Sequence, residues 1–119
     1  MIIRKMQFED IPQLAMLYKQ FWNENSNIKK MQKQFEKLQH NDTHILLCAT
    51  EESKLIGSVM GIVCEELYGE CRPFLVIENM IIDKNYRKKG VGKALFLELE
   101  SIAKQQNCTQ IILVTETDR

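Results

Sequence analysis

Residues 77–99 read Ile-Glu-Asn-Met-Ile-Ile-Asp-Lys-Asn-Tyr-Arg-Lys-Lys-Gly-Val-Gly-Lys-Ala-Leu-Phe-Leu-Glu-Leu, and this stretch decides the fold. The apolar, β-branched run that ends at Ile82 predicts a strand. After a break at Asp83, apolar residues recur at three- and four-residue steps from Val91 to Ala103 and predict a helix. The stretch is therefore a strand, a short basic turn and a helix.

The turn between these two elements concentrates positive charge where a helix disfavours it. The start of a helix carries the positive pole of its dipole, so cations there are repelled. Gly90 and Gly92 have no Cβ, which lets backbone N–H groups approach a ligand closely. A bound phosphate would resolve the conflict, whereas a solvated run of charges is the plainer alternative. The cations are Lys84, Arg87, Lys88, Lys89 and Lys93.

Two familiar phosphate-binding motifs do not fit this turn. A P-loop has a longer spacing between its glycines, and only Val91 separates Gly90 from Gly92 here. A dinucleotide-binding turn needs a third glycine where Leu95 stands, and it follows the first strand of its fold. Both motifs are therefore rejected.

The run Arg87-Lys88-Lys89-Gly90-Val91-Gly92 resembles the Arg/Gln-x-x-Gly-x-Gly/Ala element of the GNAT superfamily of acetyl-CoA-dependent N-acetyltransferases. Its surroundings strengthen the resemblance, because an apolar strand containing Glu78 precedes the turn and Asp83 ends that strand. The predicted order of elements agrees with such a domain over nearly the whole chain.

The rest of the chain supplies the other elements of one compact domain. The whole chain has 119 residues, 45% of them hydrophobic, and a formal net charge of +0. We expect an α/β (α+β) fold: a mixed, mostly antiparallel sheet with helices on both faces and one parallel β-α-β crossover. The expected strands are 1–8, 44–50, 55–64, 74–82 and 109–115, and the expected helices are 11–22, 28–39 and 91–105.

Three local patterns give further expectations. Asp10 is a good N-cap, and Gln13 completes a capping-box pattern with it. Gly57 and Gly61 interrupt the strand 55–64, which indicates a bulge or a close backbone approach. The apolar stripe of the second helix is expected to be core rather than a ligand pocket, and it consists of Ile28, Met31, Phe35 and Leu38.

The resemblance implies that acetyl-CoA is the co-substrate and assigns residues to it. The pantetheine arm would pair with the backbone of the central strand, and the N–H groups of the turn would hold the diphosphate. Side chains of Lys84, Lys88 or Lys89 would reach further phosphate oxygens. The implied cofactor-binding residues are Met80, Ile81, Ile82, Arg87, Lys88, Lys89, Gly90, Val91, Gly92 and Lys93.

Transfer to an amine needs a base, because an alkyl ammonium has no lone pair and titrates near about 10.4. Glu78, a carboxylate within an otherwise apolar strand, is the candidate catalytic base, directly or through a water. The alternative is a buried, hydrogen-bonded structural carboxylate. The N–H of Met80 would hold the developing oxyanion. Asn79 should point to the opposite face from Glu78 and be structural.

The resemblance also places the acceptor near the first helices, where Phe21, Trp22 and Glu24 would face it. Simple burial of Phe21 and Trp22 is the plainer reading for each. The loop 65–73 carries three glutamates that would suit a cationic acceptor if the loop lay beside the groove, and a solvated loop is its alternative.

Domains of this superfamily continue into a further helix and two more strands, whereas this sequence stops at Arg119. We therefore expect a single domain, 1–119, lacking those elements. In the superfamily that helix often supplies a tyrosine that protonates the thiolate, and Tyr18, Tyr68 and Tyr86 do not match its position. The unfinished sheet edge predicts pairing with a partner, such as a second copy in a homodimer.

The functional expectation is an N-acetyltransferase that moves an acetyl group from acetyl-CoA to a primary amine of a small molecule or peptide. A non-catalytic acyl-CoA-binding or interaction module and another phosphate binder remain open. The balanced charge argues against nucleic acid, and there is no membrane-spanning run. His40 and His44 lack partners at metal-ligand spacing. Four unpaired cysteines predict reduced thiols in the cytoplasm, and they are Cys48, Cys64, Cys71 and Cys108.

Overall fold

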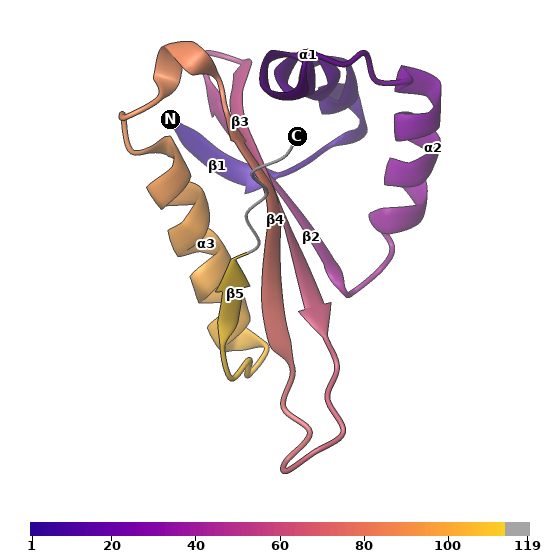
Figure 1. The fold of residues 1–119 in the computed structure, drawn as a ribbon, viewed down its shortest axis with the longest axis vertical. Helices are drawn as coiled ribbons and strands as arrows, with labels where there is room; N and C mark the ends of the chain where they lie inside the picture. Colours follow the sequence, from indigo (N-terminus) through magenta and orange to yellow (C-terminus); the bar gives the residue numbers. More distant parts are fainter. Residues whose placement is uncertain (114–119) are drawn as a thin grey trace.

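The computed structural model describes residues 1–113 as one five-stranded sheet with helices on both of its faces (Figure 1). The strand order is β1-β2-β3-β4-β5; the first three pairings are antiparallel and β4 pairs with β5 in parallel. The predicted fold class is therefore confirmed. The elements are β1 (Ile2–Lys5), η1 (Phe8–Asp10), α1 (Ile11–Trp22), α2 (Ile28–Leu38), β2 (His44–Glu51), β3 (Lys54–Cys64), β4 (Phe74–Ile82), η2 (Lys84–Tyr86), α3 (Val91–Gln105) and β5 (Ile111–Leu113).

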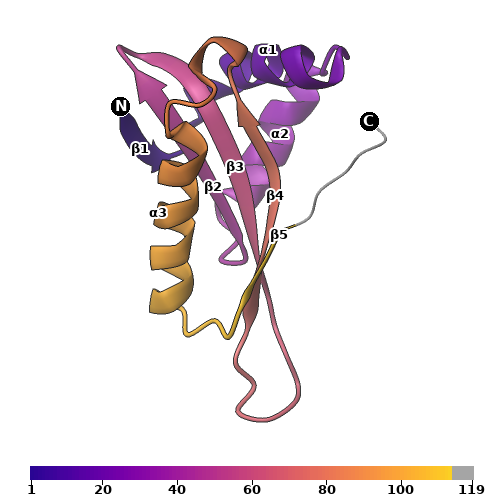
Figure 2. The same cartoon turned by 60° about the vertical axis from the view of Figure 1, so that its left-hand side comes forward.

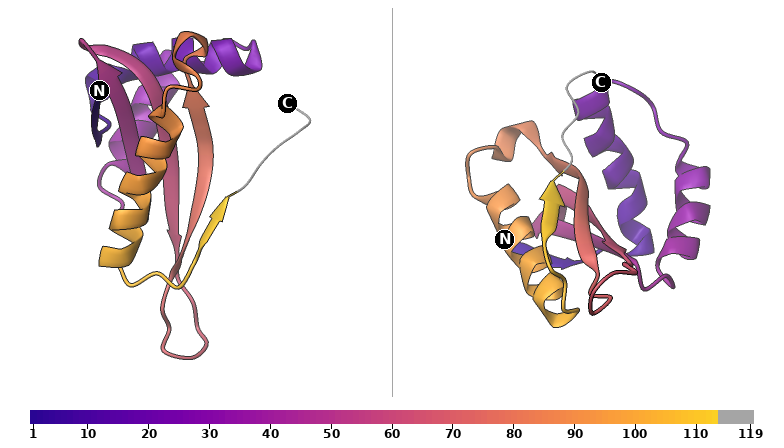
Figure 3. Two further views of the ribbon diagram at one scale, coloured as in Figure 1. Left: turned by 90° about the vertical axis from the view of Figure 1, so that its left-hand side faces the viewer. Right: turned by 60° about the horizontal axis from the view of Figure 1, so that its bottom comes forward.

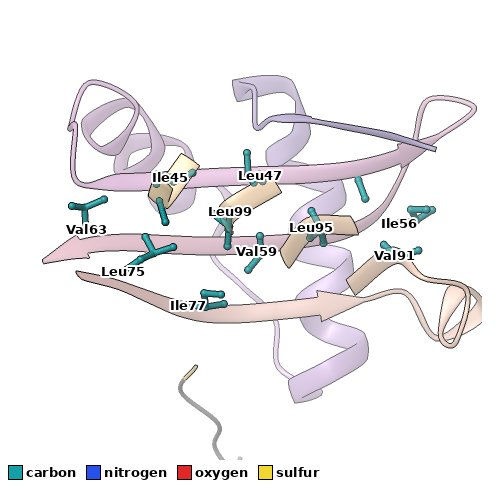
Figure 4. Packing of buried hydrophobic residues seen from close by; sticks show 12 residues of the cluster. Ile45, Leu47, Ile56, Val59, Val63, Leu75, Ile77, Val91, Leu95 and Leu99 are labelled. Carbon is teal, nitrogen blue, oxygen red and sulfur yellow. The ribbon is translucent and has the colours of Figure 1, made fainter. Parts of the chain in front are cut away.

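Helix α3 packs tightly on one face of the sheet. Leu95 and Leu99 are 0% exposed, and Figure 4 shows them with Val91 lying over the strands. Two glycines of β3 permit this approach. A Cβ on Gly57 would lie 2.9 Å from Val91 Cγ1, and one on Gly61 would lie 3.0 Å from Leu99 Cδ2. The two glycines therefore let α3 pack close to the β3 backbone. This is the close backbone approach that the sequence predicted.

The opposite face is covered by α1 and α2 and is packed less completely. Of the predicted apolar stripe on α2, Phe35 is buried, Met31 and Leu38 are half-buried, and Ile28 is 40% exposed. A pocket of about 180 Å³ remains between α1, α2 and β3, with Met31 and Leu38 in its lining. The core prediction therefore holds for Phe35, with Met31 packed against the same cluster, and fails at Ile28, because α2 lies at the outer edge of this layer beside α1 (Figure 1).

Asp10 occupies the predicted N-cap position of α1, but its side chain has a different role. It is the last residue of η1, has helical backbone angles (φ −78°, ψ −16°) and caps no N–H of α1. Its buried carboxylate instead accepts two hydrogen bonds from Arg4, at 2.7 and 2.8 Å, and one from the Gln7 N–H. The side chain of Gln13 accepts the N–H of Leu55 at 2.9 Å, so the predicted capping box is also absent.

The pKa of the Asp10 carboxyl is set by opposing effects. Burial alone would raise this pKa, whereas the hydrogen bonds from Arg4 and from the Gln7 N–H lower it. The net result is a pKa below the ordinary value for aspartate. The N-terminal strand and the start of α1 are thus joined by an ion pair that is nearly closed off from water on the Asp10 side.

The connection between β3 and β4 forms a long loop that extends away from the rest of the molecule (Figure 2). Within it, Leu67 is 96% exposed and Tyr68 is 70% exposed. The loop lies at the end of the sheet opposite to the start of α3 (Figure 1). None of the helices within residues 1–113 is long and apolar enough to cross a membrane.

Candidate functional site

The basic turn leads from β4 through η2 into α3, and its backbone takes left-handed conformations at two points. Lys88 has φ +61° and Gly90 has φ +82°. Gly90 is the N-cap of α3, and apart from Gly90 and its two chain neighbours no atom of residues 1–113 lies within 4 Å of the place where its Cβ would be. Gly90 is therefore required by the backbone angle, and the space beside it is open. Gly92 differs, because a Cβ there would only touch Met80 Sδ at 3.4 Å.

The backbone N–H groups of residues 87–93 have no protein acceptor within the part of the chain that the structure describes. The first bond of the helix is from the Ala94 N–H to the Gly90 carbonyl, at 3.0 Å. Amides that start a helix and turn through left-handed residues form a concave donor surface suited to an anion. The fold thus offers donors where the sequence predicts a diphosphate, and the assignment of individual residues stays a prediction.

The cationic side chains of this turn are exposed, and a further lysine comes from a distant part of the chain. Lys54, in the β2–β3 hairpin, has its Nζ 5.4 Å from the centre of the Tyr86 ring. Lys89 Nζ lies at the same 5.4 Å from that ring. Sequence reasoning missed Lys54, since no local pattern connects it to the turn. The exposed cations of the turn itself are Lys84, Arg87, Lys88, Lys89 and Lys93.

A β-bulge interrupts β4 just before the turn. The register pairs Met60 with Glu78 and Ser58 with Ile81, so one residue of β3 faces two residues of β4. Asn79, the first of those two, has φ +54°, a conformation that asparagine tolerates better than most residues. A bulge leaves backbone groups of the ladder unpaired and redirects the residues that follow it.

The bulge exchanges the faces of the residues beyond it. Ile77 belongs to the core beneath α3, while Ile81 packs in the core beneath α1. Met80 and Ile82 pack toward the α3 side. The strict alternation on which the prediction for Asn79 rested therefore does not hold at this point of the strand.

Glu78 lies opposite Met60 in the register, so the two share one face of the sheet. This is the face covered by α1 and α2, and Met60 lines the pocket between those helices and β3. Glu78 is half-buried, and among residues 1–113 no hydrogen bond or ion pair involves its carboxylate. The alternative of a buried, hydrogen-bonded structural carboxylate is therefore not supported. The catalytic role of Glu78 stays a prediction.

The two parallel strands pair over a short segment. Leu75–Ile77 of β4 pair with Ile111–Leu113 of β5, and Figure 3 shows β5 leaning away from β4. Along the described chain no strand pairs with the β5 side of β4 after Ile77. The edge that carries Met80, Ile81 and Ile82 is where the resemblance places the pantetheine arm. Of the strand expected over 109–115, residues 114 and 115 lie outside the described part.

The end of α1 reaches this same end of β4. Gln20 hydrogen-bonds with the turn, and its neighbours Phe21 and Trp22 form an edge-on ring pair with centroids 5.2 Å apart. Phe21 is 50% exposed, so simple burial is wrong for this residue, while Trp22 is half-buried. The acidic loop 65–73 extends from the opposite end of the sheet (Figure 2) and so does not lie beside this turn.

Cysteine and metal chemistry have no visible place at this site. All four cysteines lie in the described chain and are free thiols. Burial, with the nearby Asp10 carboxylate, raises the pKa of Cys48 to about 12, which keeps it protonated and unreactive. Within residues 1–113 no group of three or more histidine, cysteine or acidic side chains is placed to hold a metal ion.

The site thus combines one parallel strand pair, a bulge in β4 and a helix whose first amides have no acceptor among residues 1–113. Residues 11–119 match the acetyltransferase (GNAT) family, and the chain belongs to that family. Membership accounts for the glycine turn, the element order and the single crossover together.

Known relatives agree with this family. The chain is 28% identical over 68 residues to a glucosamine 6-phosphate N-acetyltransferase of Trypanosoma brucei brucei, a match that covers 57% of this chain and 46% of that protein. The chain thus spans about half the length of this curated relative.

Solved structures share the fold. A glucosamine-6-phosphate N-acetyltransferase from Arabidopsis thaliana superposes with a TM-score of 0.88 at 22% identity, covering 98% of this chain and 83% of that one. A GNAT family acetyltransferase from Staphylococcus aureus gives a TM-score of 0.84 at 28% identity, covering 98% and 87%.

Proposed function

We propose that this chain transfers an acetyl group from acetyl-CoA to the primary amine of a small molecule or peptide. The observation that carries the proposal is the set of backbone N–H groups over residues 87–93, which have no protein acceptor within residues 1–113. Family membership supplies the reaction class. Because two of the similar proteins are named for glucosamine 6-phosphate, an amino sugar phosphate belongs among the first acceptors to test.

Acetyl-CoA supplies the activated acetyl thioester, and each role of the chain follows from a feature already described. The amides from Arg87 to Lys93 bind the diphosphate, and the surrounding lysines add charge-assisted bonds. The open edge of β4 aligns the pantetheine arm. Glu78, with no hydrogen bond or ion pair among the described residues, removes the ammonium proton directly or through a water. The N–H of Met80 stabilises the oxyanion as the amine bonds to the acetyl carbon and the thiolate leaves.

The first experiment measures binding of acetyl-CoA by isothermal titration. Gly90→Glu places a carboxylate beside the amides and should abolish the binding heat. Gly69→Glu is the matched control, because Gly69 also has positive φ (+61°) and open space around it, but lies in the β3–β4 loop. Both variants carry the same backbone strain, so only the location differs. A correctly folded wild-type chain that gives no heat, or tighter binding of ATP or NAD, would overturn the proposal.

The second experiment follows thiol release in the presence of a panel of amines. Glu78→Gln should leave acetyl-CoA binding intact and slow transfer by about 10²-fold or more, the usual contribution of a general base. Glu98→Gln, on the exposed face of α3, is the control. Full activity of Glu78→Gln would remove this residue from the mechanism. Binding without thiol release for any amine would favour an acyl-CoA-binding module instead.

A further inference from the structure

Gln20, in the last turns of α1, reaches across to the basic turn with both ends of its amide. Its Nε2 donates to Asp83 Oδ2 at 3.2 Å, and its Oε1 accepts the backbone N–H of Lys84 at 3.1 Å. Within the described chain, the other bonded N–H groups of residues 84–90 have Asp83 as their acceptor, so Gln20 is the only acceptor from outside the segment 83–90. We call Gln20, Asp83 and Lys84 the Gln20 latch.

Asp83 is the buried centre of this latch and is held by three other parts of the molecule. It is 4% exposed, its carboxylate accepts the Asn85 N–H at 2.9 Å, and Lys54 Nζ lies 3.8 Å away. Its own N–H donates to the Ile56 carbonyl at 2.8 Å. Burial alone would raise the pKa of Asp83, but the Asn85 and Gln20 hydrogen bonds with the lysine charges hold it below the ordinary value. The carboxylate is therefore charged at neutral pH.

This network holds the first residues of the basic turn in place. The amides further along have no protein partner among the described residues, so their position depends on where the turn is anchored. The anchor joins α1, the β2–β3 hairpin and the end of β4. We propose that Gln20 is a positioning residue, which holds the turn so that its amides meet the diphosphate of acetyl-CoA and which couples α1 to that site. This inference rests on the proposed function.

The main test replaces Gln20 with leucine and compares steady-state constants. Gln20→Leu should raise the KM for acetyl-CoA about tenfold, consistent with loss of a hydrogen bond to a charged group, while kcat at saturation changes less than about twofold. The dissociation constant from titration should rise by the same factor. A merely structural role would lower the folded fraction without separating KM from kcat.

Gln13 provides a matched control on the same helix. It lies two turns before Gln20, and its side chain accepts the Leu55 N–H on β3 at 2.9 Å. Gln13→Leu therefore removes a bond between α1 and the sheet but does not touch the turn. Its thermal stability should fall, and its KM for acetyl-CoA should stay at the wild-type value.

A paired exchange tests the geometry itself. Gln20→Glu sets a second carboxylate against Asp83 and should raise KM more than Gln20→Leu does. Adding Asp83→Asn should restore binding toward wild type, because the new amide donates to the new carboxylate, which still accepts the Lys84 N–H. The amide oxygen at position 83 still accepts the Asn85 N–H. A folded double variant as impaired as Gln20→Glu would overturn the latch.

Hydrogen exchange separates failure of the latch from failure of the proposed function. In wild type the Lys84 amide should exchange slowly, and Gln20→Leu should accelerate exchange of this amide and its neighbours while Gln13→Leu does not. If wild type binds no acetyl-CoA, the proposed function fails and exchange alone decides whether the latch holds the turn. Equal exchange in both variants, or an unchanged KM in Gln20→Leu, would overturn the inference.

Discussion

The two faces of the sheet are attached to their helices in different ways. On one face α3 is fixed by apolar packing, with Leu95 and Leu99 fully buried against β3 and its glycines. On the other, α1 also buries apolar side chains, among them Leu14 and Leu17, but it adds polar bonds through Gln13 to β3 and Gln20 to the basic turn. Helix α2 adds a single buried side chain, Phe35.

The difference matches the demands that the proposed reaction makes on each face. The α3 face is the more closely packed support over β3, because Gly57 and Gly61 let Val91 and Leu99 approach the strand. The α1 and α2 face carries Glu78 and retains a pocket of about 180 Å³, so it has room to adapt to an acceptor. The polar bonds of Gln13 and Gln20 add direction to the apolar packing that seats α1 on the sheet.

The largest expected effect breaks the packed face. Leu95→Ala should lower the free energy of unfolding by about 3–5 kcal/mol, because Leu95 is 0% exposed and the cavity cannot refill. Chemical denaturation with urea measures this change. A loss below about 1 kcal/mol would mean that α3 is less firmly packed than its burial indicates.

A smaller effect breaks the polar attachment at the N-terminus. Arg4→Met should cost about 2 kcal/mol, because the nearly buried Asp10 carboxylate loses both guanidinium hydrogen bonds. Adding Asp10→Asn should recover part of that loss, because it removes the buried carboxylate charge that Arg4 no longer pairs. Both variants are measured by urea denaturation at pH 7. No recovery in the double variant would argue against an unpaired charge as the cause.

Acid should weaken the same polar attachments by less than the loss of Arg4. The pKa of Asp10 and that of Asp83 both lie below the ordinary aspartate value in the folded chain. Their contribution to stability is therefore fully present above the unfolded value of about 3.9 and is lost as the pH falls through the folded pKa. Unfolding midpoints should stay level from neutral pH to about 5 and drop below about 4. Asp10→Asn should flatten part of that drop.

The smallest expected effect concerns α2. Met31 is half-buried and lines the pocket, so Met31→Ala should cost less than about 1.5 kcal/mol, below the usual range for core methionine truncation. The loss in the free energy of unfolding should therefore be smaller than that of Leu95→Ala on the opposite face of the sheet. An equal loss at both positions would show that α2 is as firmly seated as α3.

Much of the fold could be predicted because its signals are local. Periodic apolar residues marked α3, glycines in β3 marked a close approach, and the spacing of Gly90 and Gly92 marked a turn with open amides. The basic turn could also be predicted, because its charged residues and its glycines are neighbours in the chain. The fold class followed from these patterns, and the expected family followed from the resemblance of the turn at residues 87–92 to a known family element.

Other features could be decided only by tertiary structure. Lys54 comes to Tyr86 through strand pairing, Asp10 takes Arg4 as its partner instead of capping α1, and the bulge at Asn79 exchanges the faces of β4. The Gln20 latch joins α1 to a turn far along the chain. The sequence by itself determines which elements form, because propensity and periodicity act over a few residues. Which polar groups meet is set by the three-dimensional arrangement of strands and helices, because those contacts span long separations and leave no local pattern.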